Sequence, residues 1–186
     1  ESRSHQFHFE SNSFMNAEDR SIELGSFFQQ YPELKPFFKD KFAKFLTDKF
    51  ENTVEISQGQ GAIQRYIQIY GFEDLLDRLP PTLERLDMDG GRNSSTANPL
   101  SPKILNFKKL KVLHVENSLS ELPDNLGTLT NLEFLSVPNN PSLKSIPLSI
   151  LDVPNLEVIN IRGNKQLEVP QEITDWGEQE GHFLIQ

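Results

Sequence analysis

A short apolar pattern recurs four times in this sequence and restricts its possible folds more than any other feature. In each copy, apolar residues stand at positions one, four and six, and position nine is a small or polar residue typical of turns. The copies begin at Leu83, Leu110, Leu132 and Leu156, which gives periods of 27, 22 and 24 residues. Recurrence at this period is typical of architectures in which each unit stacks only on its neighbours.

The second half of each repeat is similar as well. The sequence LSELPDNLGTLTN at 119–131 matches LKSIPLSILDVPN at 143–155, with a weaker copy in LEVPQEITDW at 167–176. The third repeat is two residues longer than the second because NNPSL, which ends at Leu143, stands in place of NSL, which ends at Leu119. An insertion at this point indicates a turn, since loops accept extra residues more readily than strands do.

Together the two half-patterns resemble the leucine-rich repeat family, whose units read LxxLxLxxN followed by LxxLPxxIxxLxxL. The match is specific over 110–173, is stretched by a loop over 83–109 and is faint before that. The resemblance implies an α/β solenoid, with a short parallel sheet on its concave face and short helices or turns on its convex face. It also implies that a protein or peptide partner binds the concave face.

The residues themselves give physical reasons for such coils. Alternating apolar residues predict a strand with one buried face, so Leu135 and Val137 should point inward and Phe134 outward. Asn140 and Asn164 should satisfy backbone groups in the tight turn after each strand, because a carboxamide both donates and accepts hydrogen bonds. Stacked coils then bury an apolar seam that a single repeat could not bury alone.

Weaker copies of the strand pattern occur further upstream. In QRYIQIYG, at 64–71, two isoleucines fit positions four and six, and TVEIS, at 53–57, offers a valine and an isoleucine. Ordinary isolated strands show the same short alternation. We predict a leucine-rich repeat domain over 51–186, with clear repeats from 83, 110, 132 and 156 and degenerate repeats from 51 and 64.

The first fifty residues differ from the repeats in composition, since they hold 10 of the 14 phenylalanines. The stretch ELKPFFKDKFAKFLTDKF at 33–50 has the spacing of an amphipathic helix, and HQFHFES at 5–11 suggests a strand. Because a solenoid's open apolar end must be covered, we predict that residues 1–50 form a Phe-rich helical cap. A membrane-surface helix is disfavoured because Asp40 and Asp48 mix acidic groups into the polar face. The residues predicted to cover the last repeat are Ile173, Trp176, Phe183, Leu184 and Ile185.

Composition and motifs disfavour several classes of function. The absence of cysteine excludes disulfides and thiol nucleophiles. A net charge of −9 disfavours nucleic-acid binding, and no stretch approaches the roughly 20 apolar residues of a membrane span. With no signal-peptide pattern at the N-terminus, a cytoplasmic location is the default expectation. We expect no membrane contact, no small-molecule substrate and no cofactor.

No motif indicates catalysis or metal binding. GQGAIQ at 59–64 holds two of the three glycines of a dinucleotide-binding loop, but Gln64 replaces the third and the following residues look like a strand, which favours a simple turn. His5 and His8 would lie on opposite faces of a strand, which disfavours a shared metal ion. We therefore expect no catalytic residues and no metal ligands.

One polar group could still have chemistry of its own. Equivalent positions of adjacent repeats lie about one strand spacing, ~4.8 Å, apart, so Asp87, Asp89 and Glu116 should cluster, with His114 beside Asp87. Such a group could serve as an acid/base or cation site, but charges on an open, wet sheet are screened by solvent and salt. We interpret it as solvated or partner-facing surface.

Positions three, five and seven of the repeats should form three columns on the concave face. The predicted partner-binding residues in these columns are Tyr66, Arg85, Asp87, Asp89, Val112, His114, Glu116, Phe134, Ser136, Val158, Asn160 and Arg162. The column through Val112, Phe134 and Val158 is apolar beside acidic neighbours, as in protein-binding surfaces. The alternatives are that valine and phenylalanine merely favour strands, or that a terminal segment folds over these three residues.

The sequence thus predicts a non-catalytic module that binds a protein or peptide partner on the concave face. Two alternatives remain. One is a structural subunit permanently embedded in a large assembly, which the few uneven repeats and the Phe-rich N-terminal segment favour. The other is the recognition domain of a larger enzyme such as a ubiquitin ligase.

Overall fold

The computed structural model of this protein forms two compact units. The residues that it describes are 6–8, 13–15, 24–47, 52–56, 62–90 and 97–186. The smaller unit takes residues 1–50 and 59–78, and the larger unit takes 51–58 and 79–186. None of the described helices is both long enough and apolar enough to cross a membrane.

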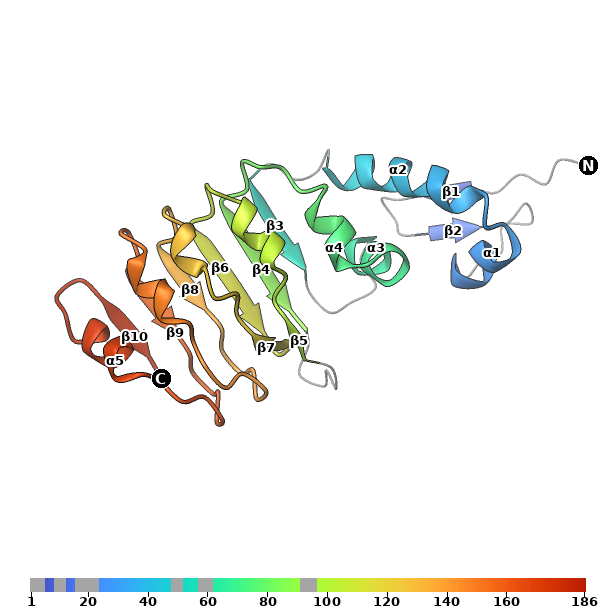
Figure 1. Ribbon diagram of the computed structural model, residues 1–186. Helices are drawn as coiled ribbons and strands as arrows, with labels where there is room; N and C mark the ends of the chain where they lie inside the picture. Colours follow the sequence, from blue (N-terminus) through green and yellow to red (C-terminus); the bar gives the residue numbers. More distant parts are fainter. Residues whose placement is uncertain (1–5, 9–12, 16–23, 48–51, 57–61, 91–96) are drawn as a thin grey trace, which may run out of the picture. The chain divides into compact units, whose positions relative to one another are not determined.

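The larger unit is built on a six-stranded sheet in which every strand is parallel to its neighbours (Figure 1). The strands are β3 (Thr53–Ile56), β4 (Arg85–Asp89), β6 (Val112–Glu116), β8 (Phe134–Ser136), β9 (Val158–Asn160) and β10 (Phe183–Ile185). Their order across the sheet follows the chain, with β3 and β10 at the two edges. This confirms the α/β class and the strands predicted within the clear repeats and within TVEIS.

Short return segments connect the strands along one side of the sheet (Figure 1). They contain η1 (Pro102–Asn106), η2 (Leu126–Thr128), η3 (Leu148–Asp152) and α5 (Gln171–Gly177), of which the first three are 3-10 helices. Two further short strands, β5 (Asn98–Pro99) and β7 (Leu119–Glu121), pair in parallel with each other. From β4 to β10, the strands of the sheet therefore alternate with short helical turns.

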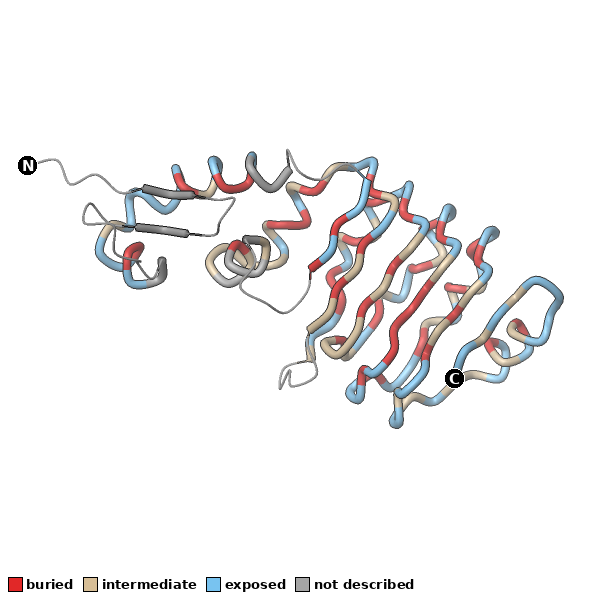
Figure 2. Tube along the Cα trace, turned by 180° about the vertical axis from the view of Figure 1, so that it is seen from behind, coloured by how far each residue is buried: buried red, intermediate tan, exposed pale blue. Residues whose placement is uncertain are grey.

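The core of the larger unit comes from the inward positions of the strands and the apolar residues of the return segments. Leu86, Leu113, Leu135 and Ile159 pair across four adjacent strands, and each has no exposed surface. Figure 2 shows buried positions alternating with more exposed ones along the strands. Val137 is also fully buried, so the predicted inward direction of Leu135 and Val137 is confirmed. Burial of one such side chain stabilises the fold by about 1.5–3 kcal/mol.

The turn after β8 is organised by the carboxamide of Asn140, which is fully buried. Its oxygen accepts hydrogen bonds from the backbone N–H groups of Ser118, at 2.9 Å, and Leu119, at 2.8 Å. Its nitrogen donates to the carbonyl oxygens of Val115, at 2.8 Å, and Pro138, at 3.0 Å. One side chain therefore satisfies four backbone groups and ties two consecutive repeats together.

Asn164 repeats this arrangement one unit later. Its oxygen accepts the backbone N–H of Asn140 at 2.6 Å, and its nitrogen donates to the carbonyl oxygens of Val137 and Ile161, both at 2.8 Å. The prediction that Asn140 and Asn164 satisfy backbone groups in the turns is confirmed.

In the smaller unit, the described residues form two paired strands and four helices. Strands β1 (Gln6–His8) and β2 (Ser13–Met15) pair antiparallel, and the helices are α1 (Leu24–Gln30), α2 (Leu34–Thr47), α3 (Ala62–Tyr70) and α4 (Phe72–Leu76). Helix α2 confirms the predicted amphipathic helix over 34–47, whereas Glu33 lies in the turn before it, and β1 confirms part of the predicted strand. Residues 48–50 of the first prediction and 5 and 9–11 of the second lie outside the described residues. Edge-on aromatic contacts join Phe28 to Phe38, Phe38 to Phe42 and Phe42 to Tyr66, with ring centroids 5.3, 5.5 and 5.4 Å apart.

The strand predicted over 64–71 is wrong, because these residues form helix α3. Ile67 and Ile69 alternate as in a strand, but Ile63, Tyr66 and Tyr70 recur at helical spacing. Tyr66 is fully buried and packs on Phe42, so helical packing prevails over the two-residue alternation. No repeat strand therefore lies in this segment, and the residues that follow the glycines of GQGAIQ are helical.

The predicted cover of the last repeat is correct in part. Ile173 and Trp176 of α5 are 0% and 7% exposed. Phe183 and Ile185 are 62% and 42% exposed, contrary to prediction. The reason is that β10 extends the sheet, so Leu184 pairs with the buried Ile159 and its two neighbours point to the other side.

Candidate binding face of the parallel sheet

The strand positions that alternate with the core positions form an open face on the sheet. Two rows of residues in register cross this open face from β3 to β10. One row reads Thr53, Arg85, Val112, Phe134, Val158 and Phe183, and the other reads Glu55, Asp87, His114, Ser136, Asn160 and Ile185. A third pair, Asp89 and Glu116, joins β4 to β6. The structure therefore brings together the columns predicted from the repeats.

Two predicted members of the columns occupy different surroundings from those expected. Tyr66 lies in helix α3 of the smaller unit, where it is fully buried and its hydroxyl donates a hydrogen bond to Asp74, so its place on the sheet was wrong. Arg162 is exposed but follows the end of β9, where its backbone N–H donates to the Asn160 side chain at 3.2 Å.

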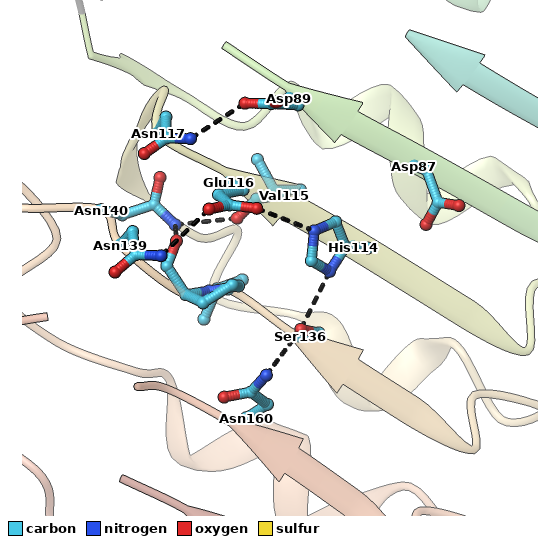
Figure 3. A network of polar contacts seen from close by, with 12 residues as sticks. Asp87, Asp89, His114, Val115, Glu116, Asn117, Ser136, Asn139, Asn140 and Asn160 are labelled. Carbon is cyan, nitrogen blue, oxygen red and sulfur yellow. Dashed lines mark hydrogen bonds and ion pairs between the residues drawn. The ribbon is translucent and has the colours of Figure 1, made fainter. Parts of the chain in front are cut away.

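A hydrogen-bonded network crosses the middle of the open face (Figure 3). His114 Nδ1 lies 2.9 Å from Ser136 Oγ, and Asn160 Nδ2 donates to the same oxygen at 3.1 Å. The direction of the bond between His114 and Ser136 depends on which imidazole nitrogen carries the proton. Nε2 lies 3.6 Å from Glu116 Oε2. Asn139 Nδ2 also donates to Glu116 Oε1, at 3.0 Å.

Ser136 lies in its predicted row of the open face, but it is only 1% exposed. It is the smallest side chain in its row, and the larger side chains of His114 and Asn160 bond to it from the two neighbouring strands. Ser136 therefore orients those two residues and does not offer contact surface of its own.

An acidic pocket of about 370 Å³ lies at the β3–β4–β6 end of the open face. The residues that line this acidic pocket are Glu55, Ile56, Arg85, Asp87, Met88, Asp89, His114 and Glu116. Arg85 Nε donates to Asp87 Oδ2 at 2.8 Å, whereas Asp87 Oδ1 is enclosed and has no hydrogen-bond partner in the described part of the chain. Asn117 Nδ2 donates to Asp89 Oδ1 at 2.9 Å. The predicted grouping of Asp87, Asp89, Glu116 and His114 is confirmed by this pocket.

A cation-ligand geometry does not accompany these carboxylates. Among the described residues, no three His, Asp or Glu side chains form a group that could hold a metal ion. Charges on such an open, wet sheet are screened by solvent and salt.

Four residues of the open face were not predicted from the sequence: Thr53, Glu55, Phe183 and Ile185. Glu55 belongs to TVEIS, whose strand was predicted but whose outward side chain was left out of the columns. Phe183 follows Val158 by 25 residues, close to the 24 residues that separate Val158 from Phe134. That spacing was the available signal for placing the last strand in the sheet.

A second polar cluster lies in the smaller unit around Asp74. The carboxylate accepts hydrogen bonds from Tyr66 and from Arg78 Nε, at 3.0 Å, and pairs with Lys39. Burial by itself raises the pKa of Asp74, but the hydrogen bonds from Lys39, Tyr66 and Arg78 outweigh it and lower the pKa below its ordinary value. Burial, followed by the bond to Asp74, raises the pKa of Tyr66. These groups satisfy one another, so the cluster stabilises the helices.

No protein-family model matches this chain, and no curated protein matches it. The function of the open face is therefore inferred from its own residues.

Proposed function

We propose that this chain is a leucine-rich repeat protein that binds a protein or peptide partner on the open face of its sheet, without catalysing a reaction. The recurring parallel strands and the asparagine-filled turns support the repeat assignment, because both follow the pattern of the sequence repeats. In this proposal the Phe-rich residues 1–50 belong to an N-terminal cap.

The observation that carries the proposal is the apolar row formed by Val112, Phe134, Val158 and Phe183. These four side chains occupy paired positions on four adjacent strands, on the side of the sheet opposite the core. Val112, Phe134 and Val158 are half-buried and Phe183 is 62% exposed. A single exposed apolar residue is ordinary on a protein surface, but a contiguous row beside polar groups is typical of a binding site.

The surroundings of this row favour binding because they are already ordered. Each strand is held on both sides by parallel pairing from β4 to β9, and the His114–Ser136–Asn160 network fixes the polar side chains beside the row. A surface that needs little reordering loses less conformational entropy on association, so more of its contact energy appears as affinity.

A charge placed in the apolar row tests the proposal. Phe134→Glu should reduce recovery of specific partners from an extract of the source cells about tenfold or more, because the carboxylate would be desolvated in the complex. Leu148→Glu is the matched control, since Leu148 is 46% exposed on η3, in a return segment. Circular dichroism must show that both variants keep the fold. If folded Phe134→Glu recovers the same partners as the wild-type chain, binding does not use the open face.

A further inference from the structure

We infer that the partner segment is extended and carries one lysine or arginine side chain together with apolar side chains four and six residues away. The inference rests on the proposed function, because it specifies what binds the same open face. It depends on three features of that face: the charge at one end, the exposed apolar residues at the other, and the distance between them.

The β3–β4–β6 end of the open face is strongly acidic. Four carboxylates line the acidic pocket, those of Glu55, Asp87, Asp89 and Glu116, and among its lining residues only Arg85 is a permanent cation. Arg85 engages one oxygen of Asp87 and leaves Oδ1 without a hydrogen-bond donor among the described residues. An enclosed carboxylate oxygen without a donor is costly, so a guest that brings N–H groups to this pocket gains charge-assisted hydrogen bonds. Lysine and arginine are the side chains that bring such donors with the opposite charge.

The β9–β10 end of the open face is apolar. Phe183 and Ile185 are two of the five large apolar side chains that stand out as exposed among the described residues. Both lie on β10, in register with Val158 and Asn160. Three apolar side chains, Val158, Phe183 and Ile185, thus share one end of the face, and they are complementary to aliphatic or aromatic side chains of a partner.

The separation of the two ends sets the spacing in the partner. Neighbouring strands lie ~4.8 Å apart, so β9 is about 14 Å and β10 about 19 Å from β4, across three and four strand spacings. An extended peptide that crosses the strands advances ~3.3 Å per residue, which corresponds to about four and six residues. Both numbers are even, so residues i, i+4 and i+6 of an extended segment all point to the same side, toward the sheet.

The test uses defined nine-residue peptides labelled with fluorescein and measures their binding to the full chain by fluorescence anisotropy. The matched probe has arginine at its second residue, leucine at its sixth and phenylalanine at its eighth, with serine and threonine elsewhere. A second probe has this order reversed, because the direction of the segment is open. A third has glutamate in place of arginine, and a fourth moves leucine and phenylalanine by one residue so that they point away from the sheet. One of the two ordered probes should bind at least about tenfold more tightly than its glutamate or shifted version.

Variants of the chain make the assignment specific. Asp87→Asn should weaken the matched probe about tenfold, while Arg85→Gln should strengthen it severalfold because a competing cation is removed from the acidic pocket. Asp124→Asn, at an exposed carboxylate outside the open face, should leave binding unchanged. Phe183→Ser should weaken binding of the matched probe and binding of the glutamate probe by the same factor.

The inference is overturned if neither ordered probe binds better than the glutamate version, or if Asp87→Asn binds the matched probe as well as the wild-type chain does. In that event, loss of the cellular partners in Phe134→Glu would still support binding on the open face, with a partner of different chemistry. If Phe134→Glu leaves both the probe and the cellular partners bound, the proposed function fails together with the inference.

Discussion

Replacement of Asn140 by alanine should destabilise the larger unit by about 4 kcal/mol. The wild-type carboxamide is fully buried and makes four hydrogen bonds of 2.8–3.0 Å, two to backbone N–H groups and two to backbone carbonyls. Each such bond contributes a net ~1 kcal/mol, and buried groups left without a partner cost more than this unless water reaches them. The sum is therefore close to 4 kcal/mol, a large share of the stability of a domain of this size.

The assay is urea unfolding followed by the fluorescence of Trp176. This is the only tryptophan of the chain, and it lies in α5, so its signal reports on the larger unit. Asn155→Ala is the matched control, because Asn155 is exposed and donates a single bond, at 3.1 Å, to the carbonyl of Thr130. The control should lose about 1 kcal/mol or less. If Asn140→Ala and Asn155→Ala lose equal stability, the asparagine turns do not hold the repeats together.

Two further substitutions test local features of the two units. Hydrogen bonds from Lys39 and the other partners of Asp74 hold the pKa of Asp74 below the unfolded value of about 3.9. Asp74 therefore stabilises the smaller unit above that pH, and this stabilisation is lost as the pH falls through the lower, folded-state pKa. Asp74→Asn should therefore lower the stability of the helices at pH 7, measured by far-ultraviolet circular dichroism during urea unfolding. The difference in stability between the variant and the wild type should shrink in acid, and a difference that stays constant with pH would contradict this. Gly163→Ala should lower the free energy of unfolding, measured with urea, more than Gly181→Ala does. Both glycines have positive φ, of 80° and 87°, but a Cβ at residue 163 would collide with the Asn139 side chain, whereas a Cβ at residue 181 meets open space. We expect about 1 kcal/mol for Gly181→Ala and at least twice that for Gly163→Ala; equal losses would show that the collision is relieved without cost.

The repeat pattern was sufficient to predict most of the larger unit. Positions four and six predicted the buried rows because side chains in a strand alternate with a strict period of two. A register shift of one residue would expose a buried leucine to water. The asparagine at position nine predicted the turn because few side chains both donate and accept hydrogen bonds in so small a volume. These are local rules, and in the repeats they all agree with the packing.

The errors occurred where packing across the chain decides between local alternatives. QRYIQIYG satisfies both a strand and a helix pattern, and only burial of Tyr66 against Phe42 selects the helix. Burial of Ser136 depends on the sizes of His114 and Asn160 on the neighbouring strands, which the repeat pattern does not specify. The place of Glu55 in the acidic pocket likewise depends on the exact register of β3 against β4, which a degenerate repeat could not supply.

Site-specific photo-crosslinking tests the central claim most directly. Phe134→benzoylphenylalanine places a crosslinking ring at the middle of the apolar row, and Leu148→benzoylphenylalanine places the same ring in the return segment η3. Each protein is irradiated with the partner recovered by the wild-type chain, and crosslinked product is measured by denaturing electrophoresis. We predict strong crosslinking from residue 134 and little from residue 148. Crosslinking from residue 148 alone would show that partners bind the other side of the sheet.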